Sequence, residues 1–131
     1  MRKAFRVLVL SLLVLISGGA TGFAGDYYRF TQDRLQEFQQ AGYPILVEID
    51  ASWCPICAKQ RPIVERLRHT AELGEMRILV IDFDTQKKDV RAMGAEIQST
   101  LIAFHGNKEM GRLVGETDED AIHKLLSMTK G

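Results

Sequence analysis

"EIDASWCPICAKQRP", residues 48–62, contains both cysteines of the 131-residue chain, Cys54 and Cys57. An apolar, β-favouring run at 45–51 leads into this stretch, and such near-continuous apolarity is typical of a strand that is covered on both faces. Pro55 suits the first position of a helix. The two thiols are therefore predicted to lie where a buried strand passes into a helix.

Alternating strand and helix patterns occupy the rest of the chain. We expect helices at 27–42, 55–73, 85–97 and 118–130, and strands at 45–51, 76–84, 100–104 and 109–115. Thr31 and Thr117 are the expected N-caps of the first and last helices. This order of elements predicts an α/β fold in which a mixed central β-sheet is flanked by helices.

The beginning of the chain has the layout of a secretory signal peptide. Three basic residues precede an apolar run at 7–16, and Gly22-Phe23-Ala24 resembles a small-x-small cleavage site. The apolar run is short for a membrane span, which needs about 20 residues. We therefore expect a signal peptide at 1–24, one domain at 25–131 and export to the periplasm. An uncleaved N-terminal membrane anchor is the alternative.

Composition limits the class of partner. Without the three basic residues of the leader, 14 Lys and Arg remain against 17 Asp and Glu, a net charge of −3. A nucleic-acid-binding domain would show a basic excess, so this class is excluded. A mature chain of this length can bury one modest core. We expect a monomer without a cofactor.

Three interpretations of Cys54 and Cys57 compete. A structural zinc site commonly takes four ligands from two pairs, whereas this chain has one cysteine pair and three widely spaced histidines, His69, His105 and His123. A structural cross-link over a two-residue gap closes almost no loop and stabilises little. Reversible dithiol–disulfide exchange fits best, because Cys-x-x-Cys beside a βαβ pattern is typical of redox sites. Binding of Cu(I) or zinc by the two thiolates is the alternative, and a redox-inert adaptor is a third.

The predicted local structure suits exchange. A thiol at a helix N-terminus is favoured as the thiolate, which is the nucleophile in disulfide exchange. Cys54 is predicted at that position. Cys57 follows one turn later, where we expect it to be more buried than Cys54 but close enough to attack a mixed disulfide formed there.

These motifs resemble those of thioredoxin-fold proteins. Trp-Cys-x-x-Cys at 53–57 is similar to the active-site motif of that family, and Pro62 is similar to its helix proline. The segment "TLIAFHGNKEMGRLVG" at 100–115 resembles the family's strand–turn–strand segment and its final glycine. The resemblance covers roughly 27–128. It implies a thioredoxin-like sandwich and the activity of a thiol–disulfide oxidoreductase.

The resemblance also implies roles for three residues. Cys54 would attack the substrate, and Cys57 would resolve the intermediate. Glu48 stands six residues before Cys54, where the family usually has a buried aspartate that relays the proton of the second cysteine. If Glu48 is buried, desolvation should raise its pKa. The alternative is a glutamate at a strand edge that reaches solvent.

We further expect Trp53, Pro55, Ser99 and Thr100 to contact the substrate. Ser99 stands where the family usually carries a cis-proline, so the chain departs from the family pattern at this point. A cis bond before a residue other than proline costs about 2.5–4 kcal/mol, and we predict a trans bond between Gln98 and Ser99. For Trp53 the alternative is a plain packing role.

The motif and the size of the chain favour different directions of electron flow. Cys-Pro-x-Cys resembles glutaredoxins and oxidising Dsb-type enzymes, but the chain is nearer to thioredoxin in size and lacks a large helical insertion. We favour a reductase or isomerase-like role that acts on disulfide-bearing exported proteins or small thiols. A membrane protein is the expected electron donor.

Overall fold

A five-stranded sheet forms the centre of the computed structural model, which describes residues 27–131; the expected signal peptide lies outside the described residues. The strand order is β1-β3-β2-β4-β5; the first three strands in this order are parallel, and β4 runs antiparallel to both of its neighbours. The strands are β1 (Tyr27–Arg29), β2 (Pro44–Asp50), β3 (Arg77–Asp82), β4 (Thr100–His105) and β5 (Lys108–Val114).

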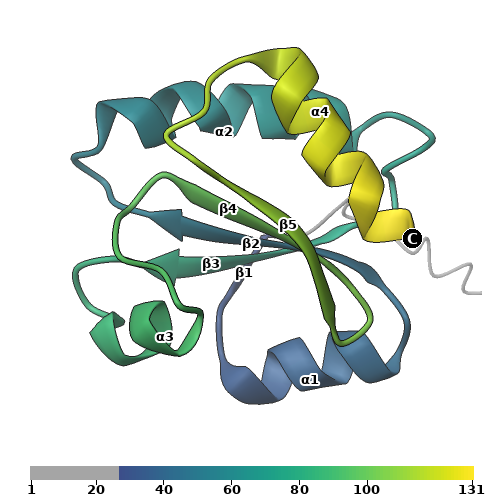
Figure 1. Ribbon diagram of the computed structural model, residues 1–131, viewed down its shortest axis with the longest axis horizontal. Coiled ribbons are helices and arrows are strands. Elements are labelled where there is room, and N and C mark those ends of the chain that lie inside the picture. Colours follow the sequence, from purple (N-terminus) through teal and green to yellow (C-terminus); the bar gives the residue numbers. More distant parts are fainter. Residues whose placement is uncertain (1–26) are drawn as a thin grey trace, which may run out of the picture.

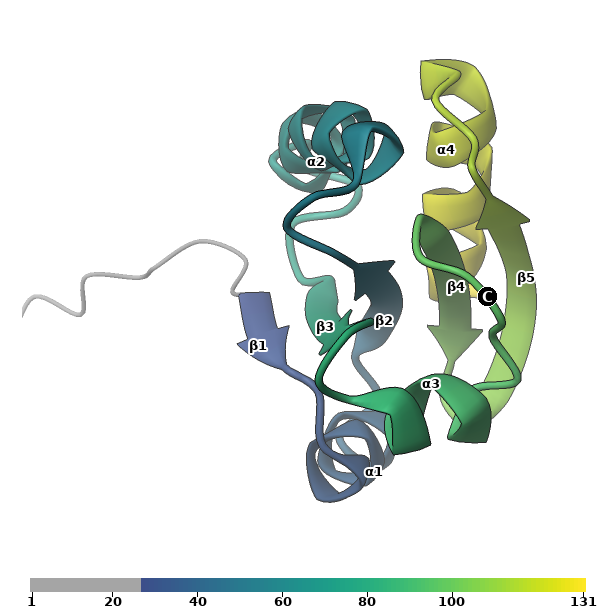
Figure 2. The ribbon, with the colours of Figure 1, turned by 90° about the vertical axis from the view of Figure 1, so that its left-hand side faces the viewer.

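Helices cover both faces of this sheet, with α2 and α4 on one side and α1 and α3 on the other (Figures 1 and 2). They are α1 (Gln32–Gln40), α2 (Pro55–Arg68), α3 (Lys87–Ala92) and α4 (Glu119–Ser127), followed by a 3₁₀ turn at Met128–Lys130. The predicted α/β sandwich with a mixed sheet is confirmed. Within residues 27–131, no helix combines the length and apolar character needed to cross a membrane.

Strand β2 is buried on both faces because its side chains alternate between two apolar clusters. Ile45, Val47 and Ile49 pack into the cluster on the α1 and α3 side, whereas Leu46 packs into the cluster on the α2 and α4 side. Successive side chains of a strand point to opposite faces. Glu48 therefore shares its face with Leu46, and this carboxyl group lies beneath α2.

The beginning of the domain differs from the prediction. Tyr27–Arg29 forms strand β1 and pairs in parallel with β3, instead of opening a helix. The helix begins only after Thr31, whose hydroxyl accepts a hydrogen bond from the Arg34 N–H at 3.1 Å. Thr31 is thus the N-cap, as predicted. The three residues of β1 gain backbone hydrogen bonds from the sheet that an early helical turn could not offer.

Helices α2 and α3 are also shorter than predicted. Helix α2 ends at Arg68 rather than at residue 73, and the Thr70 hydroxyl donates to the carbonyl of Leu67 just after the helix end. Helix α3 covers six residues, and Gly94, with φ of 63°, follows its end in the left-handed region that favours glycine.

The last helix begins one residue later than predicted. Asp118, not Thr117, is the N-cap of α4, and its carboxylate accepts from the Ala121 N–H at 2.9 Å. The Thr117 N–H donates instead to the Glu116 carboxylate at 2.9 Å, which places Thr117 in the turn before the helix.

Candidate active site

Cys54 caps the N-terminus of α2. Its backbone is extended, and its Sγ accepts a hydrogen bond from the Cys57 N–H at 3.1 Å. Pro55 is the first helical residue, as predicted. The structure joins Cys54 and Cys57 in a disulfide, with their Cα atoms 5.3 Å apart. The local structure therefore places one sulfur at the helix N-terminus and the other one turn into the helix.

The two cysteines are equally buried, each with 2% of its surface exposed. The expectation that Cys57 would be more buried than Cys54 is wrong for this disulfide form. Both side chains pack with Ala51, and the partly buried Ile56 and Phe83 adjoin them. These neighbours shield the sulfur of Cys54 from solvent together with that of Cys57.

Trp53 lies on the surface beside this disulfide. Its side chain is 57% exposed, and its indole N–H donates to the Asp84 carboxylate at 2.7 Å. Pro55 is exposed as well. Trp53 is therefore not part of the buried core. Both residues are accessible from solvent, and contact between them and a substrate stays a prediction.

Ser99 and Thr100 lie at the start of β4, with buried side chains. Thr100 donates its hydroxyl to the Ile97 carbonyl at 2.8 Å, and the Ser99 N–H donates to the Ile49 carbonyl at 2.8 Å. The bond between Gln98 and Ser99 is trans, as predicted, and none of the bonds in the described chain is cis. Because both side chains are buried, substrate contact at these residues would use the loop backbone.

Ser99 adopts a backbone conformation that L-residues rarely use. Its φ is 59°, in the left-handed region. Hydrogen bonds hold the residue in this conformation, since the Ser99 carbonyl accepts from the Gly115 N–H at 2.9 Å and from the Gln60 amide at 3.1 Å. The loop is thus fixed without a proline.

Gln60 was missed by the sequence reasoning. Its buried side-chain amide donates to the carbonyls of Ser99 and Glu116, the latter at 2.9 Å, and so ties α2 to the loops before β4 and after β5. The available signal was its spacing, because a residue three positions after Cys57 lies on the same helical face.

We expect proline at position 99 to destabilise the protein. Ser99→Pro would remove the N–H that binds Ile49 and would require φ near −65° instead of 59°. This variant should lose about 3 kcal/mol or more of stability. Ser99→Gly accepts the left-handed conformation and should stay within about 1 kcal/mol of the wild type. Urea denaturation of the two variants checks this, and a Ser99→Pro protein as stable as Ser99→Gly would contradict it.

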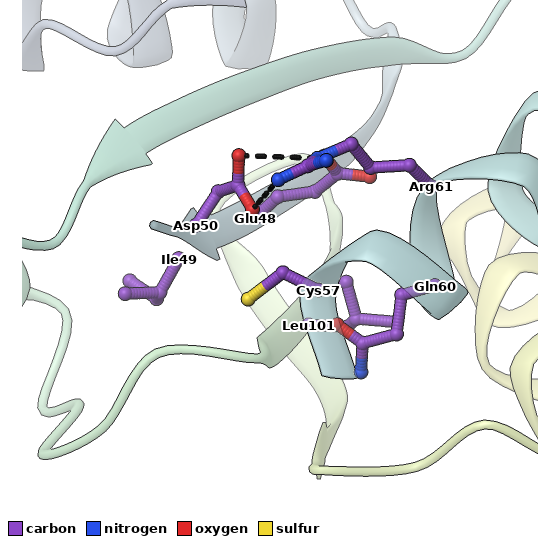
Figure 3. Close-up of a pocket in the computed structure, with 7 residues that line it drawn as sticks. All are labelled: Glu48, Ile49, Asp50, Cys57, Gln60, Arg61 and Leu101. Atoms are coloured by element: carbon purple, nitrogen blue, oxygen red, sulfur yellow. Dashed lines mark hydrogen bonds and ion pairs between the residues drawn. The ribbon is translucent and has the colours of Figure 1, made fainter. Parts of the chain in front are cut away.

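Glu48 is buried beneath the Cys57 turn. Only 6% of its surface is exposed, and its Oε1 has no hydrogen-bond partner among the described residues. It lines a cavity of about 10 Å³, which is close to the room that one water molecule needs. The lining residues are Glu48, Ile49, Asp50, Cys57, Gln60, Arg61 and Leu101 (Figure 3). The alternative of a solvent-reaching Glu48 is therefore wrong.

Burial raises the pKa of Glu48 from its ordinary value of 4.5 to about 8. Desolvation of the charged form is the main cause, and the negative charge of Asp50 adds to it, whereas Arg61 opposes it. A carboxyl group with a pKa near neutrality can both accept and release a proton under ordinary conditions. Glu48 thus has the proton affinity that a relay needs.

Asp50 and Arg61 also belong to this site, because both line the cavity beside Glu48. The Arg61 guanidinium pairs with both carboxylate oxygens of Asp50, at 3.1 and 3.3 Å. Arg61 is thus engaged with Asp50. Their spacing was the usable signal, since Asp50 shares a strand face with Glu48 and Arg61 lies four positions after Cys57.

No group of three or more His, Cys, Asp or Glu side chains within residues 27–131 could hold a metal ion.

Comparison with known proteins places this site in a family. The thioredoxin family model matches residues 29–128. The thioredoxin of Chlamydia muridarum (strain MoPn / Nigg) is 35% identical over 97 residues, which cover 74% of this chain and 92% of that protein. The thioredoxin of Chlamydia trachomatis serovar D is 35% identical over 83 residues, covering 63% of this chain and 79% of that protein.

Solved structures show the same fold. The crystal structure of Trxlp from Edwardsiella tarda EIB202 superposes with a TM-score of 0.75 at 29% identity, covering 78% of this chain and 99% of that one. A mutant thioredoxin from Halobacterium salinarum NRC-1 gives a TM-score of 0.68 at 26% identity, covering 80% of this chain and 89% of that one. Taken together, the family match over most of the chain, the common fold and the closely spaced cysteine pair show that the chain belongs to the thioredoxin family and is a thiol–disulfide oxidoreductase.

Proposed function

We propose that this oxidoreductase is exported and acts as a reductase or isomerase on disulfide-bearing exported proteins or small thiols. The layout of residues 1–24 supports export, because it has the basic start, apolar run and small residues of a signal peptide. The size of the domain, close to that of a thioredoxin, supports the reducing direction. A membrane protein is the proposed electron donor, and the enzyme works as a monomer.

The observation that carries this proposal is the position of Cys54 at the N-cap of α2. The positive end of the helix dipole and the free N–H groups of the first turn stabilise a thiolate there. The Cys57 N–H points at the Cys54 sulfur over 3.1 Å and would also favour its charged form. Cys54 is therefore the attacking cysteine.

In the first step, the Cys54 thiolate attacks one sulfur of the substrate disulfide. A bond forms between Cys54 Sγ and that sulfur, and the substrate S–S bond breaks. The other substrate sulfur leaves as a thiolate and takes a proton from solvent. The product is a mixed disulfide between enzyme and substrate.

In the second step, the Cys57 thiol gives its proton to the Glu48 carboxylate across the cavity that both residues line. The Cys57 thiolate attacks Cys54 Sγ, the mixed disulfide breaks, and the second substrate sulfur leaves as a thiolate. The substrate has gained two electrons, and the enzyme holds the Cys54–Cys57 disulfide. The electron donor then returns the disulfide to the dithiol.

Expression of the full chain in a bacterium with a periplasm tests the proposal. The mature protein should appear in the periplasmic fraction with a mass that corresponds to residues 25–131. It should catalyse insulin reduction by dithiothreitol, and Cys54→Ser should reduce the rate to that of the uncatalysed reaction. Ser52→Ala, a change at an exposed neighbour, is the matched control and should keep full activity.

Three outcomes would contradict parts of the proposal. Catalysis that survives Cys54→Ser would show that Cys54 is not the attacking thiol. A wild-type protein that fails to reduce insulin but binds Cu(I) or zinc through Cys54 would support the metal-binding alternative instead. An intact leader found in the membrane fraction would show that residues 1–24 act as a membrane anchor and not as a cleaved signal peptide.

A further inference from the structure

The Asp50–Arg61 ion pair lies directly beside Glu48. Asp50 follows Glu48 by two positions on β2, so both side chains project from the same face of the sheet. Arg61 reaches back from α2 to Asp50, and its guanidinium also donates to the Ala51 carbonyl at 3.4 Å. Figure 3 shows Asp50, Arg61 and Glu48 together on one side of the cavity, with Cys57 coming from α2.

Arg61 borders both this cavity and the protein surface. It lines the cavity together with Glu48 and Cys57, and it also lines an open surface groove with Tyr27, Pro62 and Glu65. The Arg61 side chain is 43% exposed, whereas Glu48 is 6% exposed. The guanidinium therefore stands at the boundary between the buried carboxyl group and the surface.

We propose that Asp50 and Arg61 are a positioning pair that controls when Glu48 can accept the proton of Cys57. The inference rests on the proposed role of Glu48 as the proton acceptor. Arg61 favours the ionised form of Glu48, and Asp50 opposes it, so each charge of the pair offsets the other at the cavity. The pair thus keeps the pKa of Glu48 between the lower value expected beside Arg61 alone and the higher value expected beside Asp50 alone.

The other groups around Glu48 are apolar or paired with each other, so they do not take over the effect of the Asp50–Arg61 pair. The register partners of Glu48 on β3 and β4 are Val80 and Leu101, both apolar. From α2, Glu65 and Arg68 act on Glu48 with opposite signs, and they are bound to each other at 2.7 Å.

Tyr27, on β1, is a further titratable group that interacts with Glu48. Burial and the nearby charges of Glu48 and Glu65 raise the pKa of the Tyr27 phenol above its usual range, so it stays neutral. Asp50 and Arg61 are therefore the charges that line the cavity together with Glu48.

Single changes in the pair should act in opposite directions. Asp50→Asn leaves the Arg61 cation without its partner, so Glu48 should ionise at a lower pH. Arg61→Gln leaves the Asp50 anion uncompensated, so Glu48 should ionise at a higher pH. Each shift should be about one pH unit. The double variant should return close to the wild type, because both charges are then removed.

The readout is the reaction of the reduced protein with 5,5′-dithiobis(2-nitrobenzoate). Attack by Cys54 releases the first chromophore at a rate that depends on reagent concentration, whereas attack by Cys57 releases the second at a rate that does not. The pH midpoint of the second phase reports proton acceptance. Infrared titration of the Glu48 carboxyl band in the oxidised protein, where neither cysteine titrates, gives an independent midpoint.

Two control variants sharpen the result. Arg66→Gln removes a positive charge from the same helix, but Arg66 pairs with the exposed Glu119 at 2.6 Å, and the midpoint should not move. Arg61→Lys keeps the charge and should stay near the wild-type midpoint, which a purely structural role of the guanidinium would not explain.

The failures of the two proposals are distinguishable. If Glu48→Gln shifts the pH midpoint of the second phase while Asp50→Asn and Arg61→Gln leave it unchanged, the positioning pair is overturned and the role of Glu48 stands. If Glu48→Gln leaves the midpoint of the second phase unchanged, the role of Glu48 is overturned, and the inference about the pair falls with it.

Discussion

Cys57→Ser should stop turnover without stopping the attack by Cys54. A serine hydroxyl cannot displace the substrate sulfur from Cys54, so the mixed disulfide accumulates instead of being resolved. Insulin reduction should fall to the uncatalysed rate. A covalent adduct between Cys54 and the substrate should appear on non-reducing gels and should disappear with dithiothreitol. Stopped-flow measurement of the reaction with 5,5′-dithiobis(2-nitrobenzoate) should still show release of the first chromophore.

The double variant Cys54→Ser, Cys57→Ser is the control for this result and should form no adduct. Expression of the Cys57→Ser variant with its leader would also trap natural partners, whether they are substrates or the electron donor. Adducts that form equally in Cys54→Ser would assign the attack to Cys57. Turnover by Cys57→Ser at the wild-type rate would show that the second cysteine is not needed to resolve the intermediate.

The sequence predicted those parts of the fold that local patterns determine. The apolar run of β2 and the helix start at Pro55 indicated the position of both cysteines, and the structure has them at that junction. Strand β1 was missed because Tyr27–Arg29 is a three-residue edge strand whose pairing partner, β3, lies much later in the chain. Nothing in three residues distinguishes such a strand from the start of a helix.

In the candidate site too, local patterns predicted some residues, whereas others became evident only in the folded structure. Glu48 was found because its spacing from Cys54 matched the family pattern. Gln60 was assigned no role, and Arg61 was not linked to Asp50, because their contacts depend on which loops and strands pack against α2. A polar residue on a helix is more often solvated than buried. Only the packed fold shows that Gln60 is enclosed and that Arg61 reaches Asp50.

Glu48→Gln should stabilise the protein at alkaline pH. In the folded protein the pKa of Glu48 is about 8, compared with an ordinary value of 4.5. Below pH 4.5 the group is protonated in both the folded and the unfolded state, so its ionisation costs nothing. Between these two pKa values the unfolded chain releases this proton while the folded protein keeps it.

The sign of the effect follows from the bound protons. The unfolded state binds fewer protons than the folded state in this window, so the free energy of unfolding decreases as pH rises. The loss is complete above about pH 8 and is on the order of 5 kcal/mol, at roughly 1.4 kcal/mol per pKa unit. Glutamine has no such ionisation, so the variant should lack this slope. Its advantage over the wild type should grow from about pH 5 to about pH 9.

Urea denaturation of the oxidised proteins at about pH 5, 7 and 9 measures this difference. Glu109→Gln on β5 is the control, because the Arg112 hydrogen bond lowers the pKa of Glu109 and this residue is not among the charges that act on Glu48. Glu109 is therefore ionised in both states over most of this range, and its replacement should leave the slope unchanged. If wild type and Glu48→Gln kept a constant difference across the range, Glu48 would already be ionised in the folded protein. It could then not take up the Cys57 proton in the way proposed, since a carboxylate that stays ionised across this range has too low a proton affinity for the relay.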